Sequence, residues 1–151
     1  MKKSLFSVIF ALAALLFAGC SSGYQPGITG LGIELTRIER GADGLTRVHW
    51  LINNPNIIAY LVGGSTHKIY LDGGLVGTTT LREPIGVPKQ SQQPQSAILK
   101  IEGTGGHALT IALSRGSATY RLESNLTITV YGEGKENYRA VATGTVLVVA
   151  K

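Results

Sequence analysis

From residue 33 to residue 150, the chain is dominated by short runs in which apolar and polar residues alternate. The clearest run covers residues 45–53, where Val48, Trp50 and Ile52 share one face of an extended chain. Alternation with a period of two is typical of a strand that buries one face. Turn-forming residues separate the runs at intervals of roughly 8 to 15 residues, and no helix alternates regularly with the strands. The pattern therefore favours an all-β fold.

We expect about seven strands and one short helix. The helix is predicted over residues 107–115, because Ala108, Ile111 and Ala112 follow helical spacing. Gly116 is suited to ending this helix. Three prolines make residues 82–95 unsuitable for a central strand. This combination is typical of an antiparallel β-sandwich that is immunoglobulin-like or fibronectin-type-III-like. The strands are predicted over residues 33–40, 45–53, 68–71, 75–81, 96–102, 119–131 and 138–150.

Residues 1–19 have the features of a signal peptide. Lys2 and Lys3 precede an apolar run over residues 5–18. A helix of that length spans about 21 Å, short of the roughly 30 Å hydrocarbon core of a bilayer, so it is not expected to be a transmembrane anchor. The run ends in Leu-Phe-Ala-Gly directly before Cys20, the only cysteine of the chain. These features are typical of a signal peptide that is removed from the mature chain.

The segment that ends in Cys20 resembles a bacterial lipobox, which implies that Cys20 is lipidated. The alternative is an ordinary secretory signal in which Cys20 is incidental. Ser21 follows where an aspartate would favour the inner membrane, so the resemblance implies an outer-membrane lipoprotein that faces the periplasm. Residues 20–30 would form the lipidated, flexible tether, which reaches about 33 Å when extended. The folded domain is then expected over residues 31–151, held at the membrane through Cys20.

Charge and composition exclude several classes of partner. The chain has 14 Lys or Arg and 9 Asp or Glu, and removal of the signal peptide leaves 12 basic residues with no basic cluster. A nucleic-acid partner is therefore not expected. A single cysteine allows neither an intramolecular disulfide nor a multi-cysteine metal site. No long apolar surface requires a second copy, so a monomer is expected.

Two turn motifs stand out. Asn54, Pro55 and Asn56 end the strand that contains Trp50, since proline stops the ladder and asparagine side chains hydrogen-bond nearby backbone. Asp72 and Gly73 are suited to the tight turn of a hairpin. Together with the apolar stretch between them, these motifs resemble the late-embryogenesis-abundant (LEA) type 2, or water-stress and hypersensitive-response (WHy), domain. The resemblance is greatest over residues 48–77.

That resemblance implies a β-sandwich with one short helix that protects against desiccation, cold or osmotic stress. It implies a protectant that stabilises partly unfolded client proteins or the envelope, without catalysis. The alternative is a structural adaptor or assembly component of an envelope complex, which would dock a partner strand on a sheet edge.

Catalytic and metal sites are weakly indicated. His49, His67 and His107 fall in different predicted elements, without the spacing of a zinc site. A triad could assemble from Ser65, His67 and Asp72, but a polar loop and a hairpin turn explain these residues more simply. Four glutamates could in principle pair as acid and base, but positions on solvated sheet faces explain them better. They are Glu34, Glu39, Glu102 and Glu123. We therefore predict no active site, metal or cofactor.

Overall fold

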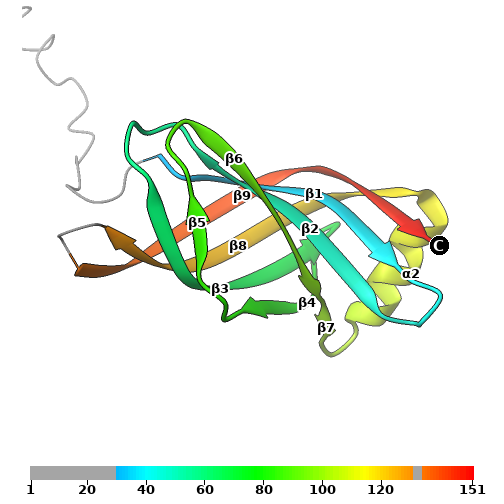
Figure 1. Cartoon of the computed structure of the whole chain (residues 1–151). Coiled ribbons are helices and arrows are strands. Elements are labelled where there is room, and N and C mark those ends of the chain that lie inside the picture. Colours follow the sequence, from blue (N-terminus) through cyan, green and yellow to red (C-terminus); the bar gives the residue numbers. More distant parts are fainter. Residues whose placement is uncertain (1–29, 131–133) are drawn as a thin grey trace, which may run out of the picture.

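The computed structural model describes residues 30–130 and 134–151, which form an all-β domain with one short helix (Figure 1). The described residues form nine strands in one sheet, and the helix α2 precedes the last two strands in the sequence. The elements are β1 (Gly32–Arg40), β2 (Thr46–Asn54), β3 (Tyr60–Leu71), β4 (Gly74–Leu81), β5 (Ile85–Val87), β6 (Ser91–Ile98), β7 (Lys100–Ile101), α2 (Gly105–Arg115), β8 (Ser117–Val130) and β9 (Gly134–Ala150).

The strands form one mixed sheet. Its order is β6-β2-β1-β9-β8-β3-β4-β7, and β5 adds to β3 beside this path. Most neighbours are antiparallel, but β1 and β9 run parallel, with Arg37 opposite Leu147 and Arg40 opposite Ala150. The first and last strands of the domain therefore lie side by side in the middle of the sheet. This parallel pair joins the N-terminal strand of the domain to its C-terminal strand.

The sheet is curled so that its halves face each other across the core. The rings of Trp50 on β2 and His67 on β3 lie 4.5 Å apart, although β1, β9 and β8 separate these strands in the sheet. The Leu35 amide on β1 also donates to the hydroxyl oxygen of Tyr120 on β8, at 3.3 Å. Trp50 is 2% exposed and lies in this core, on the strand face that it shares with buried Val48 and Ile52.

The segment from β6 to β7 joins the two ends of the sheet. Its first part pairs with β2 and its last two residues pair with β4. The Leu99 amide donates to the Thr46 carbonyl at 2.8 Å. Every second residue of an antiparallel strand bonds to the partner in this way, so the backbone nitrogen of Pro94, five residues earlier, points away from β2. Pro94 therefore removes no bond from the ladder. Residues 91–95, expected to lie outside a central strand, begin this terminal strand of the sheet.

Helix α2 packs on β4, β8 and β9, with Leu109 and Ala112 fully buried. It begins two residues before the predicted range and ends at Gly116, whose φ of 76° is left-handed. The Gly116 amide donates to the Leu113 carbonyl at 3.3 Å, which satisfies a free carbonyl at the helix end. The helix covers one end of the curled sheet (Figure 1).

The all-β class with one short helix is confirmed. The structure differs from the expectation in two details. Its described residues form nine strands where about seven were expected, and the sheet is mixed where an antiparallel one was expected. The predicted signal peptide, Cys20 and the tether up to residue 29 lie outside the described residues. Within the part that is described, no helix has both the length and the hydropathy to cross a bilayer.

Candidate functional site

Asn54 is the centre of the Asn-Pro-Asn corner. Its side chain is fully buried, and its amide nitrogen donates to the carbonyls of Ile58 at 2.8 Å, Pro88 at 2.9 Å and Val87 at 3.4 Å. Its amide oxygen accepts the Asn56 amide hydrogen at 3.0 Å. One side chain thus ties the β2–β3 connection to the end of β5. The corner is held by neutral hydrogen bonds.

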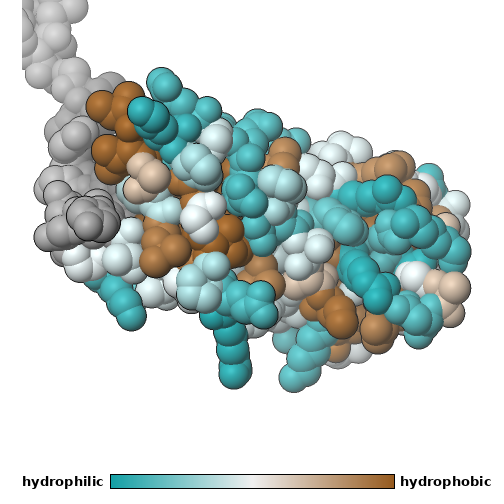
Figure 2. All heavy atoms as spheres, viewed as in Figure 1, coloured by the Kyte–Doolittle hydropathy of each residue, from teal (hydrophilic) through white to brown (hydrophobic). Residues whose placement is uncertain are grey.

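Beyond Asn54, the corner presents apolar side chains to the outside. Ile57 is 78% exposed, Ile58 47% and Leu61 44%. Pro55 and Ala59 are also exposed. We call this set of five residues the apolar tip. Figure 2 shows apolar spheres gathered at this end of the molecule.

Asp72 and Gly73 lie in the turn between β3 and β4, both with positive φ, of 48° and 85°. The Asp72 carboxylate accepts hydrogen bonds from the Thr119 hydroxyl at 2.8 Å and the Thr119 amide at 3.1 Å, and it pairs with Arg115 at 3.4 Å. These bonds, the Thr119 hydroxyl foremost, lower the pKa of Asp72. The turn is thereby connected to β8 and to the end of α2.

A buried histidine lies between two serines inside the core. His67 is fully buried, its Nε2 lies 2.9 Å from the Ser65 hydroxyl and its Nδ1 lies 2.8 Å from the Ser124 hydroxyl. Hydroxyls donate or accept, so either neutral tautomer of the ring satisfies both nitrogens. Burial lowers the pKa of His67 to about 4, and the ring is therefore neutral at pH 7.

The structure brings together Ser65 and His67 but not Asp72. Asp72 lies at the far end of β3, where Thr119 and Arg115 hold it. The position that an aspartate would take in a triad is filled by Ser124, which is fully buried. Ser65 is 5% exposed, so this serine-histidine arrangement joins β3 to β8 inside the core. Its chemistry is that of a satisfied buried polar network.

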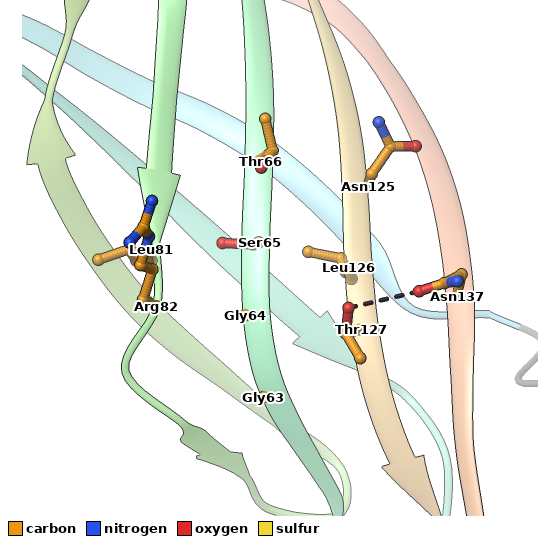
Figure 3. A pocket seen from close by; sticks show the side chains of 10 residues that line it. All are labelled: Gly63, Gly64, Ser65, Thr66, Leu81, Arg82, Asn125, Leu126, Thr127 and Asn137. Carbon is orange, nitrogen blue, oxygen red and sulfur yellow. Dashed lines mark hydrogen bonds between the residues drawn. The ribbon is translucent and has the colours of Figure 1, made fainter.

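A groove lies on the sheet next to this network, and Ser65 of the network is one of its lining residues. It measures about 540 Å³ and lies over Gly63 and Gly64, which have no side chain to fill it. Leu81 and Arg82 line one side, and the other carries the hydroxyl and amide groups of β3, β8 and β9 (Figure 3). On that side, the Thr127 hydroxyl lies 3.3 Å from the Asn137 amide oxygen. The groove offers uncharged hydrogen-bonding groups and the one cation of Arg82.

The groove belongs to a larger polar surface across β4, β3, β8 and β9. Residues that alternate with the core positions of these strands point outward, and many of them carry a hydroxyl or an amide. Thr80, Thr66 and Asn125 are cross-strand neighbours, with 3.5 Å between the two hydroxyl oxygens. We call this set the hydroxyl face, comprising Thr66, Thr80, Asn125, Thr127, Asn137 and Thr143.

The other candidate residues lie apart. Glu39 accepts from Lys151 at 2.8 Å and pairs with Arg37 at 3.2 Å, and Lys151 foremost lowers the pKa of Glu39. Glu123 pairs with two arginines on its own face of the sheet. Among the described residues, no three His, Cys, Asp or Glu side chains are grouped to hold a metal ion. Glu34 and Glu39 lie on β1, Glu123 lies on β8, and Glu102 follows β7.

Sequence reasoning missed Ser124 and the groove. Ser124 lies 57 residues from His67 along the chain, so only the register of β3 with β8 reveals the contact. Gly63 and Gly64 are an unusual pair for a strand, and this pair is the sequence signal that could have indicated a hollow there. The Asn54 hydrogen bonds to the β5 end span 33 and 34 residues and were likewise not predictable.

Solved structures provide a comparison for this architecture. The solution structure of a putative late embryogenesis abundant protein is similar, with a TM-score of 0.51 and 12% identity over 97% of this chain and 84% of the other. The fold is LEA-like. A second solution structure, of a protein from Arabidopsis thaliana, has a TM-score of 0.47 and 11% identity over 86% of this chain and 91% of that one.

A crystal structure of a protein from Archaeoglobus fulgidus also has a TM-score of 0.47, with 15% identity over 80% of this chain and 97% of the other. No family model and no curated protein sequence matches the chain. At 12% identity, the likeness to the LEA protein shows a shared fold.

Proposed function

We propose that this chain is a non-catalytic LEA type 2 (WHy) lipoprotein that protects other proteins at the cell envelope during loss of water. Cys20 carries the lipid anchor, and the domain acts from the periplasmic face of the outer membrane. The LEA-like fold and the lipobox-like sequence before Cys20 support this proposal.

The hydroxyl face is the observation that carries the protective role. Proteins that lose water expose backbone groups and strand edges, which then associate with one another. A rigid surface of threonine hydroxyls and asparagine amides offers donors and acceptors to such groups without requiring a particular sequence. The groove over Gly63 and Gly64 lets an extended segment approach the sheet backbone closely. Many weak contacts of this kind would shield a client without binding it tightly.

A drying and freezing assay tests this function. The chain from Cys20 onward is mixed with an enzyme that aggregates on drying, and recovered client activity is compared with that in serum albumin at equal mass. We expect greater recovery with this protein. Equal recovery in the two samples would remove the specific protective role.

The hydroxyl face has a matched test. The double variant Thr66→Val/Thr80→Val replaces two of its hydroxyls by methyl groups and retains side chains that favour strands. The control Thr36→Val/Thr110→Val makes the same change at exposed threonines elsewhere. We expect the first variant to lose client recovery and the control to retain it. Equal recovery in both variants would show that the hydroxyl face is not the contact surface.

A crosslinking experiment separates protection from the adaptor function. Membranes are crosslinked and the protein is purified together with its partners. Many sub-stoichiometric clients support a protectant, whereas one stoichiometric partner supports an adaptor of an envelope complex and overturns the present proposal.

A further inference from the structure

The apolar tip and the point at which the described chain begins lie at the same end of the domain. A β-carbon built on Gly30 would be 3.6 Å from the Pro55 ring and 3.9 Å from the Asn56 amide oxygen. The next residue, Leu31, is 3% exposed, and its carbonyl accepts the Tyr138 hydroxyl at 2.9 Å. The position of Gly30 beside the corner is therefore fixed by the core. We call this end the Gly30 end.

From this observation we propose that the apolar tip rests in the lipid surface to which Cys20 is attached. The inference rests on the proposed lipid anchor and adds an orientation to it. The chain between Cys20 and Gly30 spans at most about 33 Å when extended, and any shorter conformation brings the Gly30 end closer to the bilayer. The first surface to meet the lipid is then the one that carries Ile57 and Ile58.

The exposure of the tip fits a lipid contact. Ile57 is 78% exposed, the highest value among the large hydrophobic side chains of the described residues. Ile58 and Leu61 are also exposed, and Figure 2 shows apolar spheres at this end of the molecule beside hydrophilic ones. Exposed apolar side chains next to one another indicate a surface that is covered in use. A few aliphatic side chains bind a bilayer only weakly, so the tip would orient the anchored domain without itself holding it there.

Several backbone groups of the Asn-Pro-Asn corner are hydrogen-bonded within the protein. Asn54 satisfies the Ile58 carbonyl and the Asn56 amide, and the Gln90 amide donates to the Asn56 carbonyl at 2.9 Å. Backbone groups that are bonded within the protein lose little when lipid replaces water. The ion pairs of the described residues lie elsewhere, at the opposite end or along the outer sheet face. Lipid contact at the Gly30 end would therefore desolvate no ion pair.

Exposed Lys89 adds a charge that suits the membrane. It precedes Gln90 in the β5–β6 connection, which the Gln90–Asn56 hydrogen bond holds against the corner. A lysine beside an apolar tip is attracted to anionic headgroups, as at the edge of an interfacial segment. Seated in this way, the domain would project α2 away from the bilayer (Figure 1).

Tryptophan quenching tests the tip without depending on natural lipidation. The chain from Cys20 onward is made without acylation and coupled through the Cys20 thiol, its only thiol, to a maleimide lipid. The vesicles contain phosphatidylethanolamine, phosphatidylglycerol and brominated phosphatidylcholine. The Ile57→Trp variant places a fluorophore at the tip, and the matched Thr110→Trp variant places one on exposed α2. Buried Trp50 contributes the same background to both.

We expect bromine to quench the emission of the Ile57→Trp variant at least threefold more than that of the Thr110→Trp variant. Equal quenching, or none at position 57, would overturn the proposed contact. Amide exchange of the unmodified chain, coupled in the same way, checks that tryptophan itself does not create the contact. Exchange at residues 56–61 should slow on vesicles, whereas exchange along α2 should not change, and unchanged exchange at residues 56–61 would also overturn it.

Mass spectrometry of the N-terminal peptide from cells tests the anchor separately. Acyl chains on Cys20 would support the lipoprotein proposal. An unmodified Cys20, combined with quenching in coupled vesicles, would overturn the anchor and leave the lipid affinity of the tip standing. Acylated Cys20 without quenching would overturn the tip alone.

Discussion

At the Gly30 end of the domain, Asn54 holds the connection between β2 and β3, and at the opposite end Asp72 holds the hairpin between β3 and β4. Asn54 is fully buried and neutral, and all its bonds go to backbone groups. Asp72 is charged, its side chain is 41% exposed, and it accepts from Thr119 and pairs with Arg115. Both side chains fasten a turn, but only Asp72 depends on charge.

The rest of each end follows the same division. The end with α2, which we call the helix end, also holds the pair of Arg47 with Asp43 at 2.7 Å and the pair of Lys151 with Glu39 at 2.8 Å. The Gly30 end holds the apolar tip and the exposed Lys89, but none of the ion pairs of the described residues. Charged groups stay hydrated at a surface that remains in water, while backbone groups that are bonded within the protein are suited to a surface that leaves water. This difference would suit the proposed lipid contact of the Gly30 end.

Both ends of the domain pack on one core that contains Trp50, and the Trp50→Ala variant tests whether they unfold together. Removing a large ring that is 2% exposed leaves a cavity, so we expect a loss of about 3–5 kcal/mol in the free energy of unfolding. Urea unfolding followed by circular dichroism measures the loss, and amide exchange should accelerate at both ends together. Ile57→Ala, at an exposed position, is the control and should change stability by about 0.5 kcal/mol or less. Unchanged unfolding in Trp50→Ala would contradict the position of Trp50 in the core.

Acid should destabilise the shared core through His67 and the helix end through Asp72, because the pKa of each is lowered in the fold. Asn54 at the Gly30 end does not titrate. Burial lowers the pKa of His67 to about 4 from an ordinary 6.5, so the unfolded chain binds more protons between these values. Stability should therefore be full above pH 6.5 and fall by about 3 kcal/mol as the pH drops towards 4. Urea midpoints from pH 4 to 7 measure this fall.

His67→Gln is the control for the acid effect. Glutamine carries a donor and an acceptor for Ser65 and Ser124 but no proton that titrates in this range. The pH dependence between 4 and 6.5 should therefore flatten in the variant, whatever its stability at pH 7. An equal slope in both proteins would show that His67 does not remain neutral in the fold.

The two ends also differ in how much the sequence could predict. The Asp72-Gly73 turn follows from local residue types, because positive φ at both positions favours aspartate and glycine. The strand with Trp50 follows from alternation. The role of Pro55 in ending that strand is equally local. The sequence therefore predicts turns and half-buried strands where the information lies within a few residues.

Long-range pairing supplied the rest. The parallel contact of β1 with β9 joins residues that are 110 apart, and no local pattern chooses that partner. The first half of β3 was missed because Gly63 and Gly64 break the alternation, and the start of β6 because glutamine and proline have low strand propensity. Ser124 was missed as a partner of His67 because the two residues lie 57 apart in the sequence. These contacts are decided by register across the curled sheet.

At the Gly30 end, Asn54→Ala should cost about 2–3 kcal/mol, because the loss of one side chain leaves buried carbonyls and one amide without partners. Asn54→Asp should cost at least as much, since a carboxylate would face the carbonyls of Ile58 and Pro88 without a hydrogen to donate. Urea unfolding measures both. Asn53→Ala, at the exposed neighbour, is the control and should have little effect. A near-neutral Asn54→Ala would mean that the corner is held by other contacts.

At the helix end, the expected effects are the smallest and depend on salt. Asp72→Asn retains an oxygen that accepts from Thr119 and a residue type that tolerates positive φ, but it loses the charge that pairs with Arg115. The melting temperature should fall slightly, and the difference from the parent should shrink as salt screens the exposed pair. Asp72→Ala loses the Thr119 bonds as well and should melt lower than Asp72→Asn at every salt concentration. If Asp72→Ala were more damaging than Asn54→Ala, the buried neutral side chain would not be the stronger fastening, and the contrast between the two ends would have to be reversed.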